Sequence, residues 1–256
     1  NGMATVIVLS LLYGLLGHHA TGIFEGAQND ADKLFIYLYS DGSAVLGFIM
    51  MVAGTLVLGF LILGQVMQSS GAIVFFSDIA MAAIGKRRGG PAKVAIIGSS
   101  LMGTVSGSSV ANIMSTGMVS IPLMKKNGFS GPMAAGIEAV ASNGSQLAPP
   151  VMGATAFIIA EYLELPYSTI VAAAILPAFV YYLFLFCQVD FYARDKGMVG
   201  LKASEIPNIK EVLKKGWIFI LPLMVLVFFL FVLTYNPAKS ALYATLSLLV
   251  LALVKY

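Results

Sequence analysis

The sequence AKVAIIGSSLMGTVSGSSVANIMSTGMVSIPLM, residues 92–124, decides the fold. An apolar arm at residues 92–103 leads into the polar stretch TVSGSS, and a second apolar arm at residues 110–124 follows. Each arm is too short to cross a bilayer, which takes roughly 20 apolar helical residues. Basic residues flank both outer ends, KRR at 86–88 and KK at 125–126. Because basic flanks favour the cytoplasmic side, the sequence predicts a re-entrant hairpin with its tip near mid-membrane.

The polar tip, residues 104–109, is the first indication of function. Non-helical backbone survives at membrane depth only where protein or a water-filled cavity satisfies its polar groups. The tip offers hydroxyl and carbonyl oxygens from Ser, Thr and Gly. The alternative is one spanning helix that is kinked at Gly107 and uses small residues for tight packing. We favour the hairpin, because a kinked helix would place the basic clusters on opposite faces of the membrane.

The composition is that of a multi-pass membrane protein. Of 256 residues, 59% are hydrophobic and 11% are charged, and the mean hydropathy is +0.90. Long apolar runs of this kind predict an all-α fold of membrane helices. The one cysteine, Cys187, excludes an internal disulfide. The sequence shows neither a metal-ligand cluster nor a nucleotide-binding motif, so we expect no cofactor and no nucleic-acid partner.

The chain before the hairpin predicts two membrane helices and one interfacial helix. Residues 3–17 are apolar and just long enough to span, and the acidic, lysine-poor loop at 18–41 belongs outside. Residues 43–67 form a full-length span that runs inward. Residues 71–85 carry apolar side chains at helical spacing and are typical of an amphipathic helix in the cytoplasmic interface. A prolongation of the preceding span is the alternative.

A second broken segment follows the hairpin. Two short apolar helices, residues 133–142 and 151–162, are separated by a stretch rich in Ser, Asn, Gly and Pro, so they form one span broken in its middle. Proline at the start of the second half suits a helix N-terminus. Glu138 lies in the first half, and an ionisable residue at membrane depth is a functional candidate. It is either a carrier of a coupling proton or a side chain that reaches the inner interface.

The remaining residues predict further membrane segments. Residues 167–188 return inward, the polar stretch 190–215 lies in the cytoplasm, residues 217–234 span outward, and residues 240–254 begin another span. The outer loops then hold only two lysines. This arrangement satisfies the positive-inside rule.

The two breaks together predict a binding site. Helix C-termini at Gly103 and Ser142 present carbonyls with partial negative charge, and helix N-termini near Ser109 and Val151 present N–H groups with partial positive charge. Carbonyls and hydroxyls suit a small cation such as sodium, and N–H groups suit a carboxylate. Paired discontinuous helices indicate the site of a secondary transporter. The expected sodium ligands are Ser106, Ser108, Asn143 and Gly144.

Two strings of residues carry a family resemblance, GKRRGGPAKVAIIGSSLMGTVSGSSVANIMSTGMVSIPLMKKNGF at 85–129 and EAVASNGSQLAPPVMGATAFIIAE at 138–161. They resemble the large membrane subunit of TRAP (tripartite ATP-independent periplasmic) transporters, most closely the fused permeases of the TAXI subtype. The resemblance runs from about residue 34 to the C-terminal end. The chain begins without an initiator Met and stops inside an apolar run, so we expect it to cover the first half of such a permease.

The resemblance implies an elevator-type transporter of the cell inner membrane, in which a hairpin and a broken helix from each of two inverted repeats form the site. Residues 1–85 would then be scaffold and interfacial helices, residues 86–166 a transport-domain segment, and residues 167–256 scaffold helices, a cytoplasmic amphipathic segment and the start of the second repeat. It also implies a periplasmic substrate-binding protein, an organic acid such as a dicarboxylate as substrate, and a sodium or proton gradient. The substrate-binding residues expected by position are Thr104, Ser106, Gly107, Ser108, Ser109, Asn112, Ser145, Pro149 and Pro150.

Two other classes of function stay open. An intramembrane serine hydrolase would use Ser106 or Ser108 as nucleophile and a histidine as base. The two histidines, His18 and His19, fall in the predicted outer loop, so we expect a transporter and not an enzyme. A channel whose hairpin lines the pore is the third class, and gradient-driven uptake would separate it from a transporter.

Overall fold

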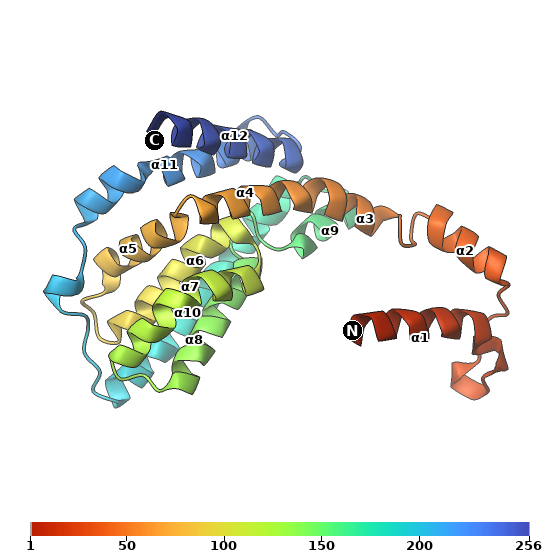
Figure 1. Ribbon diagram of the computed structural model, residues 1–256, viewed down its shortest axis with the longest axis horizontal. Helices are drawn as coiled ribbons and strands as arrows, with labels where there is room; N and C mark the ends of the chain where they lie inside the picture. The colour runs from red at the N-terminus through yellow and green to blue at the C-terminus, as the bar shows by residue number, and fades with distance from the viewer. Residues whose placement is uncertain (1, 256) are drawn as a thin grey trace. The chain divides into compact units, whose positions relative to one another are not determined.

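The computed structural model describes residues 2–255, and every regular element in that range is a helix (Figure 1). This confirms the all-α fold class. Four helical stretches are long and apolar enough to cross a membrane, as expected of a multi-pass membrane protein. They are Gly2–His19, Phe48–Ser69, Tyr167–Asp195 and Ala203–Val232.

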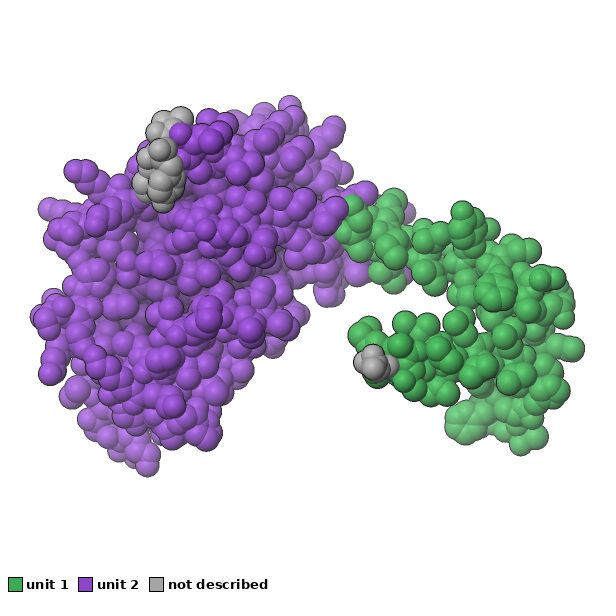
Figure 2. Space-filling model, in the orientation of Figure 1, with its two compact units in different colours: residues 1–54 green, residues 55–256 purple. Residues whose placement is uncertain are grey.

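The chain packs as two units, and the first unit ends at Gly54 (Figure 2). It contains α1 (Gly2–Leu16), α2 (Ala31–Ser40) and α3 (Phe48–Val52). Neither α1 nor α2 has a buried residue. The apolar side chains of α1 are therefore exposed around the helix, as in a helix that lipid surrounds. Part of the stretch 18–41, which the sequence predicts as a loop, forms α2.

The second unit, which begins at Thr55, contains the hairpin and the broken span. Short π-type turns occur at Ala53–Val57 and Phe228–Val232, and a 3₁₀ turn at Ala203–Glu205. The helices are α4 (Leu58–Ser69), α5 (Ala72–Ile84), α6 (Gly90–Ser106), α7 (Ser109–Lys126), α8 (Gly131–Asn143), α9 (Ala154–Tyr162), α10 (Tyr167–Asp195), α11 (Ile209–Val227) and α12 (Pro237–Lys255).

The predicted hairpin consists of α6 and α7, which lie side by side and are joined by Gly107 and Ser108 (Figure 1). Gly107 has φ 58, and a Cβ there would lie 1.8 Å from the Met152 carbonyl oxygen, so only glycine fits this turn. The Ser108 Oγ accepts from the Ala111 N–H at 3.3 Å and caps α7. The chain thus reverses here, and the kinked-helix alternative is wrong. Both helices are longer than the predicted arms, because helical backbone continues through the flanks and to Ser106.

A left-handed glycine also separates α4 from α5. Gly71 has φ 93, which ends one helix and begins the next. The alternative in which residues 71–85 prolong the preceding span is therefore wrong. The location of α5 in the cytoplasmic interface remains a prediction.

The broken span differs from the prediction in its second half. The first half, α8, ends at Asn143 and passes into a 3₁₀ turn, Gly144–Gln146. The second half begins at Ala154, three residues later than residue 151. Pro149 and Pro150 lie in the turn and do not start the helix, and Met152 has a left-handed φ of 56 just before α9. A left-handed non-glycine residue is uncommon and is often found at functional sites.

The core of the second unit joins α6, α7, α8 and α10. Small side chains on α6 and α8 let these helices approach closely, as is usual between membrane helices. A close approach occurs at Gly103, where a Cβ would lie 2.7 Å from the Cβ of Ser145, in the 3₁₀ turn that follows α8. The buried apolar cluster consists of Ala92, Ala95, Ile96, Met124, Phe129, Ala134, Ile137, Ala141, Leu185 and Val189.

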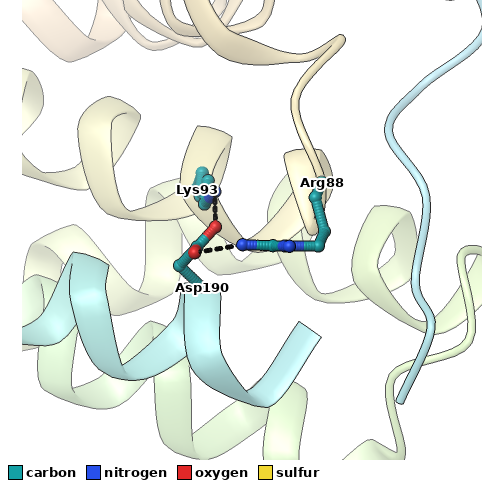
Figure 3. A network of polar contacts seen from close by, with 3 residues as sticks. All are labelled: Arg88, Lys93 and Asp190. Atoms are coloured by element: carbon teal, nitrogen blue, oxygen red, sulfur yellow. Dashed lines mark hydrogen bonds and ion pairs between the residues drawn. The ribbon is translucent and has the colours of Figure 1, made fainter. Parts of the chain in front are cut away.

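An ion network ties the base of the hairpin to α10 (Figure 3). Asp190 accepts from Arg88 at 2.5 Å and from Lys93. The Lys93 side chain is only 4% exposed, and its ammonium lies 4.9 Å from the centre of the Phe186 ring. The helix α10 runs to Asp195, beyond the predicted end at residue 188, and this extension places Asp190 at the hairpin. The predicted polar segment 190–215 therefore starts on a helix.

Candidate functional site

A cavity of about 340 Å³ lies where the hairpin tip meets the second half of the broken span and α4. We call it the tip cavity. The hairpin contributes Ser106, Gly107, Ser108, Ser109 and Val110. The lining also includes Val151, near which the sequence predicts a helix N-terminus. Residues that sequence reasoning did not select complete it: Val57, Phe60, Leu61, Gln146, Met152, Gly153, Ala154, Thr155 and Phe157.

Two helix N-termini meet in the tip cavity. The helix α7 begins at Ser109 and α9 begins at Ala154, and both residues line the cavity. The first N–H groups of a helix have no partner within that helix and carry partial positive charge. Two such ends beside one cavity make a site that favours an anion such as a carboxylate.

Three buried oxygen atoms near this site lack a hydrogen-bond partner among the described residues: Ser106 Oγ, Asn112 Oδ1 and Ser145 Oγ. Their side chains are at most 7% exposed. An unpaired buried polar atom costs roughly 1–3 kcal/mol, so each calls for an explanation. One explanation is that these oxygens bind a ligand.

The residues with the three unpaired oxygens come from α6 (Ser106), α7 (Asn112) and the 3₁₀ turn after α8 (Ser145), and one face of α6 relates them. Ser99, Gly103 and Ser106 lie on that face by helical spacing. The Asn112 Nδ2 donates to the Ser99 carbonyl at 2.9 Å, and Ser145 packs against Gly103. Hydroxyl and amide oxygens are hard ligands that suit a cation such as sodium.

Three of the four expected sodium ligands make other contacts. The Ser108 hydroxyl caps α7. Asn143 is exposed, and its Oδ1 accepts from the Ser109 hydroxyl at 3.1 Å. Gly144 is packed so tightly that a Cβ would lie 2.6 Å from the Tyr181 ring. Asn143 and Gly144 are not part of the lining of the tip cavity.

Of the nine expected substrate-binding residues, Ser106 to Ser109 line the tip cavity. Thr104 and Pro149 line a different cavity of about 290 Å³ beside α10, and Asn112, Ser145 and Pro150 line neither cavity. The Thr104 hydroxyl donates to the Leu101 carbonyl at 2.7 Å. The Pro150 carbonyl accepts from the Tyr167 hydroxyl at 3.1 Å. The structure therefore does not bring Thr104, Pro149 and Pro150 to the tip cavity.

Glu138 is completely buried, with 0% exposure. Its carboxylate accepts hydrogen bonds from four hydroxyl groups and does not reach the surface, so the interfacial alternative is wrong. We call these hydroxyls the Glu138 cage. They come from α6, α7 and α8 and belong to Ser99, Thr116, Ser120 and Ser142.

Sequence reasoning missed Gln146, whose Nε2 donates to the Ser109 hydroxyl at 3.0 Å across the two breaks. It also missed residues 153–155 around the start of α9. The small-residue string GAT, which follows the prolines after two intervening residues, is a signal that could have indicated a close approach of backbone to a ligand. The cage hydroxyls could not be found in this way, because they are separated in sequence.

The serine hydrolase alternative gains no support. The Ser106 hydroxyl is without a partner, and the Ser108 hydroxyl serves as a helix cap. A serine nucleophile needs a base within hydrogen-bond reach. Both histidines of the chain belong to the first unit, so the unit that holds these serines offers no histidine base.

Comparisons with known proteins agree on one family. The family profile described as "Tripartite ATP-independent periplasmic transporter, DctM component" matches residues 2–256. A C4-dicarboxylate TRAP transporter large permease protein of Pseudomonas aeruginosa is 24% identical over 197 residues, 77% of this chain and 46% of that protein. A protein of Haemophilus influenzae named as a TRAP transporter large permease is 23% identical over 198 residues, again 77% and 46%. The chain thus spans about half the length of the curated relatives it matches.

Proposed function

This chain belongs to the DctM-component family of tripartite ATP-independent periplasmic transporters, and on that premise we propose that it forms one half of the substrate site of an ion-driven carboxylate permease. The permease imports an organic acid across the cell inner membrane and receives it from a soluble periplasmic binding protein. The name of the Pseudomonas relative supports a C4-dicarboxylate or a related acid as the substrate class.

The meeting of two helix N-termini in the tip cavity is the observation that carries this proposal. The N–H groups at the starts of α7 and α9 bind one carboxylate of the substrate. The Ser109 hydroxyl and the Gln146 amide, which already contact each other, lie at the same cavity and orient that group. The helix N-termini bind the carboxylate here without a charged side chain, as in other transporters with broken helices.

A sodium ion is the proposed coupling ion at this site. It is held by the unpaired oxygens of Ser106, Asn112 and Ser145, together with carbonyls at the C-terminal end of α6. Asn143 and the Gly144 carbonyl support the adjoining turn. The ion and the carboxylate share the end of one hairpin, so each lowers the free energy of binding the other.

The proposed movement is that of an elevator, in which the hairpin and the broken span move together. Two contacts between the hairpin and the broken span support it. Gly103 and Ser145 are interlocked, and the Ser109 hydroxyl donates to Asn143 Oδ1 at 3.1 Å.

Uptake into proteoliposomes tests the function. The full-length permease and its binding protein would be supplied with radiolabelled succinate and an inward sodium gradient. We expect accumulation above the external concentration, with loss of accumulation when the gradient is collapsed. Downhill flux alone would indicate a channel, and absence of flux for every carboxylate tested would contradict the proposal.

A further inference from the structure

We propose that Glu138 is a proton-binding site that exchanges its proton with water through a second, small cavity between α5, α6 and α7. This cavity shares no lining residue with the tip cavity. The proposal that the bound proton drives transport rests on the proposed function, whereas the existence of the proton site does not.

The Glu138 cage stabilises the carboxylate without a cation. The hydroxyls of Ser99 and Ser142 each donate to Oε1 at 2.9 Å. The Thr116 hydroxyl also donates to Oε1, and the Ser120 hydroxyl donates to Oε2. Four O–H donors satisfy most of the acceptor capacity of an ionised carboxylate. A buried negative charge can persist in this setting because hydrogen bonds to the charged form are strong.

The same cage satisfies the protonated form without movement of any heavy atom. A hydroxyl is both donor and acceptor. When Oε1 carries the proton, it donates to Thr116 Oγ1, and Thr116 turns its own O–H to the Asn112 carbonyl, 2.8 Å away. Glu138 can therefore gain or lose a proton by rotation of hydroxyl groups alone. This is the property that a reversible proton carrier requires.

The second cavity provides the path for the proton. Its volume is about 10 Å³, which is close to the minimum for one water molecule. Three cage residues line it, Ser99, Thr116 and Ser120, and Ser77 of α5 faces them. A water needs two to four polar partners to be stable in a buried site, and these four hydroxyls supply them.

The transfer conserves atoms and charge. Water in the cavity gives a proton to Thr116 Oγ1 while Thr116 passes its own proton to Glu138 Oε1. The O–H bond of the water and the original O–H bond of Thr116 break, and new O–H bonds form on Thr116 and Glu138. The hydroxide left in the cavity then takes a proton from solvent on the side of α5 and becomes water again. The net result is uptake of one solvent proton and a neutral Glu138.

Charged groups on the surrounding helices do not compete for this proton. On α6, Lys93 is paired with Asp190. On α10, Tyr181 and Tyr182 donate to carbonyls of α8. Asp78 of α5 lines a different cavity, toward α11. Among the described residues, the hydrogen bonds of the Glu138 carboxylate all come from hydroxyl groups.

A chain of hydrogen bonds connects Glu138 to Asn112, one of the proposed sodium ligands. Thr116 contacts both Glu138 and the Asn112 carbonyl, and the Asn112 side chain has the unpaired Oδ1 that we assign to the sodium ion. Ser142 donates to Glu138 from the end of α8, three residues before Ser145. A change of protonation at Glu138 thus alters the orientation of groups next to the ion site.

Infrared difference spectroscopy of the full-length permease in lipid tests the proton site without any substrate. We expect a carboxylic-acid band that appears on acidification, is lost in Glu138→Gln, and remains in Glu161→Gln, which changes an exposed residue. Loss of the band in Glu138→Gln alone supports the site. A spectrum of Glu138→Gln identical to that of the parent across the pH range would overturn it.

Gly98→Ala tests the path. A Cβ at Gly98 would enter the cavity lining at an ordinary contact distance of 3.9 Å from Ser77 Oγ, so the helices can stay in place. We expect hydrogen–deuterium exchange of the Glu138 band to slow by roughly tenfold, or about 1.4 kcal/mol in the barrier. Gly136→Ala is the matched control, because a Cβ there meets nothing within 4 Å. Exchange at the parental rate in Gly98→Ala would overturn the path.

Transport then tests the coupling. Glu138→Gln should lose proton-driven accumulation and keep exchange of internal for external substrate, while Gly98→Ala should slow only the proton-driven mode. Proton-driven accumulation that is unchanged in Glu138→Gln would overturn the coupling. A parent protein that takes up no carboxylate would contradict the proposed function, and the infrared result would still decide the proton site.

Discussion

At the scale of single residues, buried oxygens distinguish this site from ordinary helix packing. Ser115, one turn from Asn112, donates to a backbone carbonyl of its own helix and needs nothing further. Ser106 and Ser145 are also buried, and their hydroxyls have no partner among the residues that the structure describes. An apolar side chain would be more favourable at both positions if folding were the only requirement. The unpaired hydroxyls of Ser106 and Ser145 therefore indicate that a ligand binds here.

Alanine at these two positions should separate binding from stability. Ser106→Ala or Ser145→Ala removes an ion ligand, a loss of order 1–3 kcal/mol, so the sodium concentration for half-maximal uptake should rise roughly five- to 150-fold. The thermal midpoint without sodium should stay the same or rise, because an unpaired buried group is removed. The control is Ser247→Ala, whose hydroxyl bonds only the Ala244 carbonyl. A fall in midpoint with unchanged sodium dependence would contradict the assignment.

At the scale of elements, the hairpin and the broken span pack closely against each other. Their contact requires glycine at two positions. The helix α6 contacts the 3₁₀ turn at Gly103, and the hairpin turn contacts Met152 at Gly107. The two breaks are thereby held against each other, and the starts of α7 and α9 come to one cavity.

Gly103→Ala should disturb this contact. The new Cβ would lie 2.7 Å from the Ser145 Cβ and 2.9 Å from its Cα, so backbone must move. We expect a loss of about 1–3 kcal/mol in stability, as for other overpacked sites, together with weaker sodium binding because Ser145 is displaced. Thermal unfolding and sodium titration in detergent would measure both. Gly136→Ala, at an open position inside α8, should leave sodium affinity unchanged and should not lower the midpoint, and a normal sodium affinity in Gly103→Ala would argue against Ser145 as a ligand.

The re-entrant topology of the hairpin is open to a labelling test. Arg87 and Lys125 are exposed and lie at the outer ends of α6 and α7. With Cys187 replaced by serine, single cysteines at Arg87 and Lys125 should both react with an impermeant thiol reagent from the cytoplasmic side. A cysteine at Lys239, which lies between the two predicted spans 217–234 and 240–254 and in the first turn of α12, should react from the other side. Labelling of Arg87→Cys and Lys125→Cys from opposite sides would show that the pair of helices crosses the membrane.

At the scale of the whole molecule, the Asp190 network fastens the hairpin base to α10 over a long sequence separation (Figure 3). The buried Lys93 ammonium depends on Asp190 as its anionic partner. Removal of one partner from a buried ion pair leaves an uncompensated charge. This costs more stability than replacement of both partners by apolar side chains. The network thus holds the second unit together at the end opposite to the hairpin tip.

Asp190→Asn should lower the thermal midpoint, because the ammonium of Lys93 is left buried without a counter-ion. Lys93→Met combined with Asp190→Asn should recover part of the loss, since the charge is removed and the stem is kept. Fluorescence-detected thermal unfolding in detergent would rank the parent first, the double variant second and Asp190→Asn last. Equal midpoints for the single and double variants would show that Lys93 does not need this partner.

The sequence by itself determined the membrane class, the hairpin and the broken span. These features depend on local properties: apolar length, the conformational freedom of Gly107, the small polar residues at each break, and basic flanks. Only the tertiary structure decided where the helices end around the breaks, which of the selected residues share a cavity, and that Glu138 is enclosed. Its four partners lie between residues 99 and 142 on three helices. No local pattern brings them together, because their contact depends on how those helices pack.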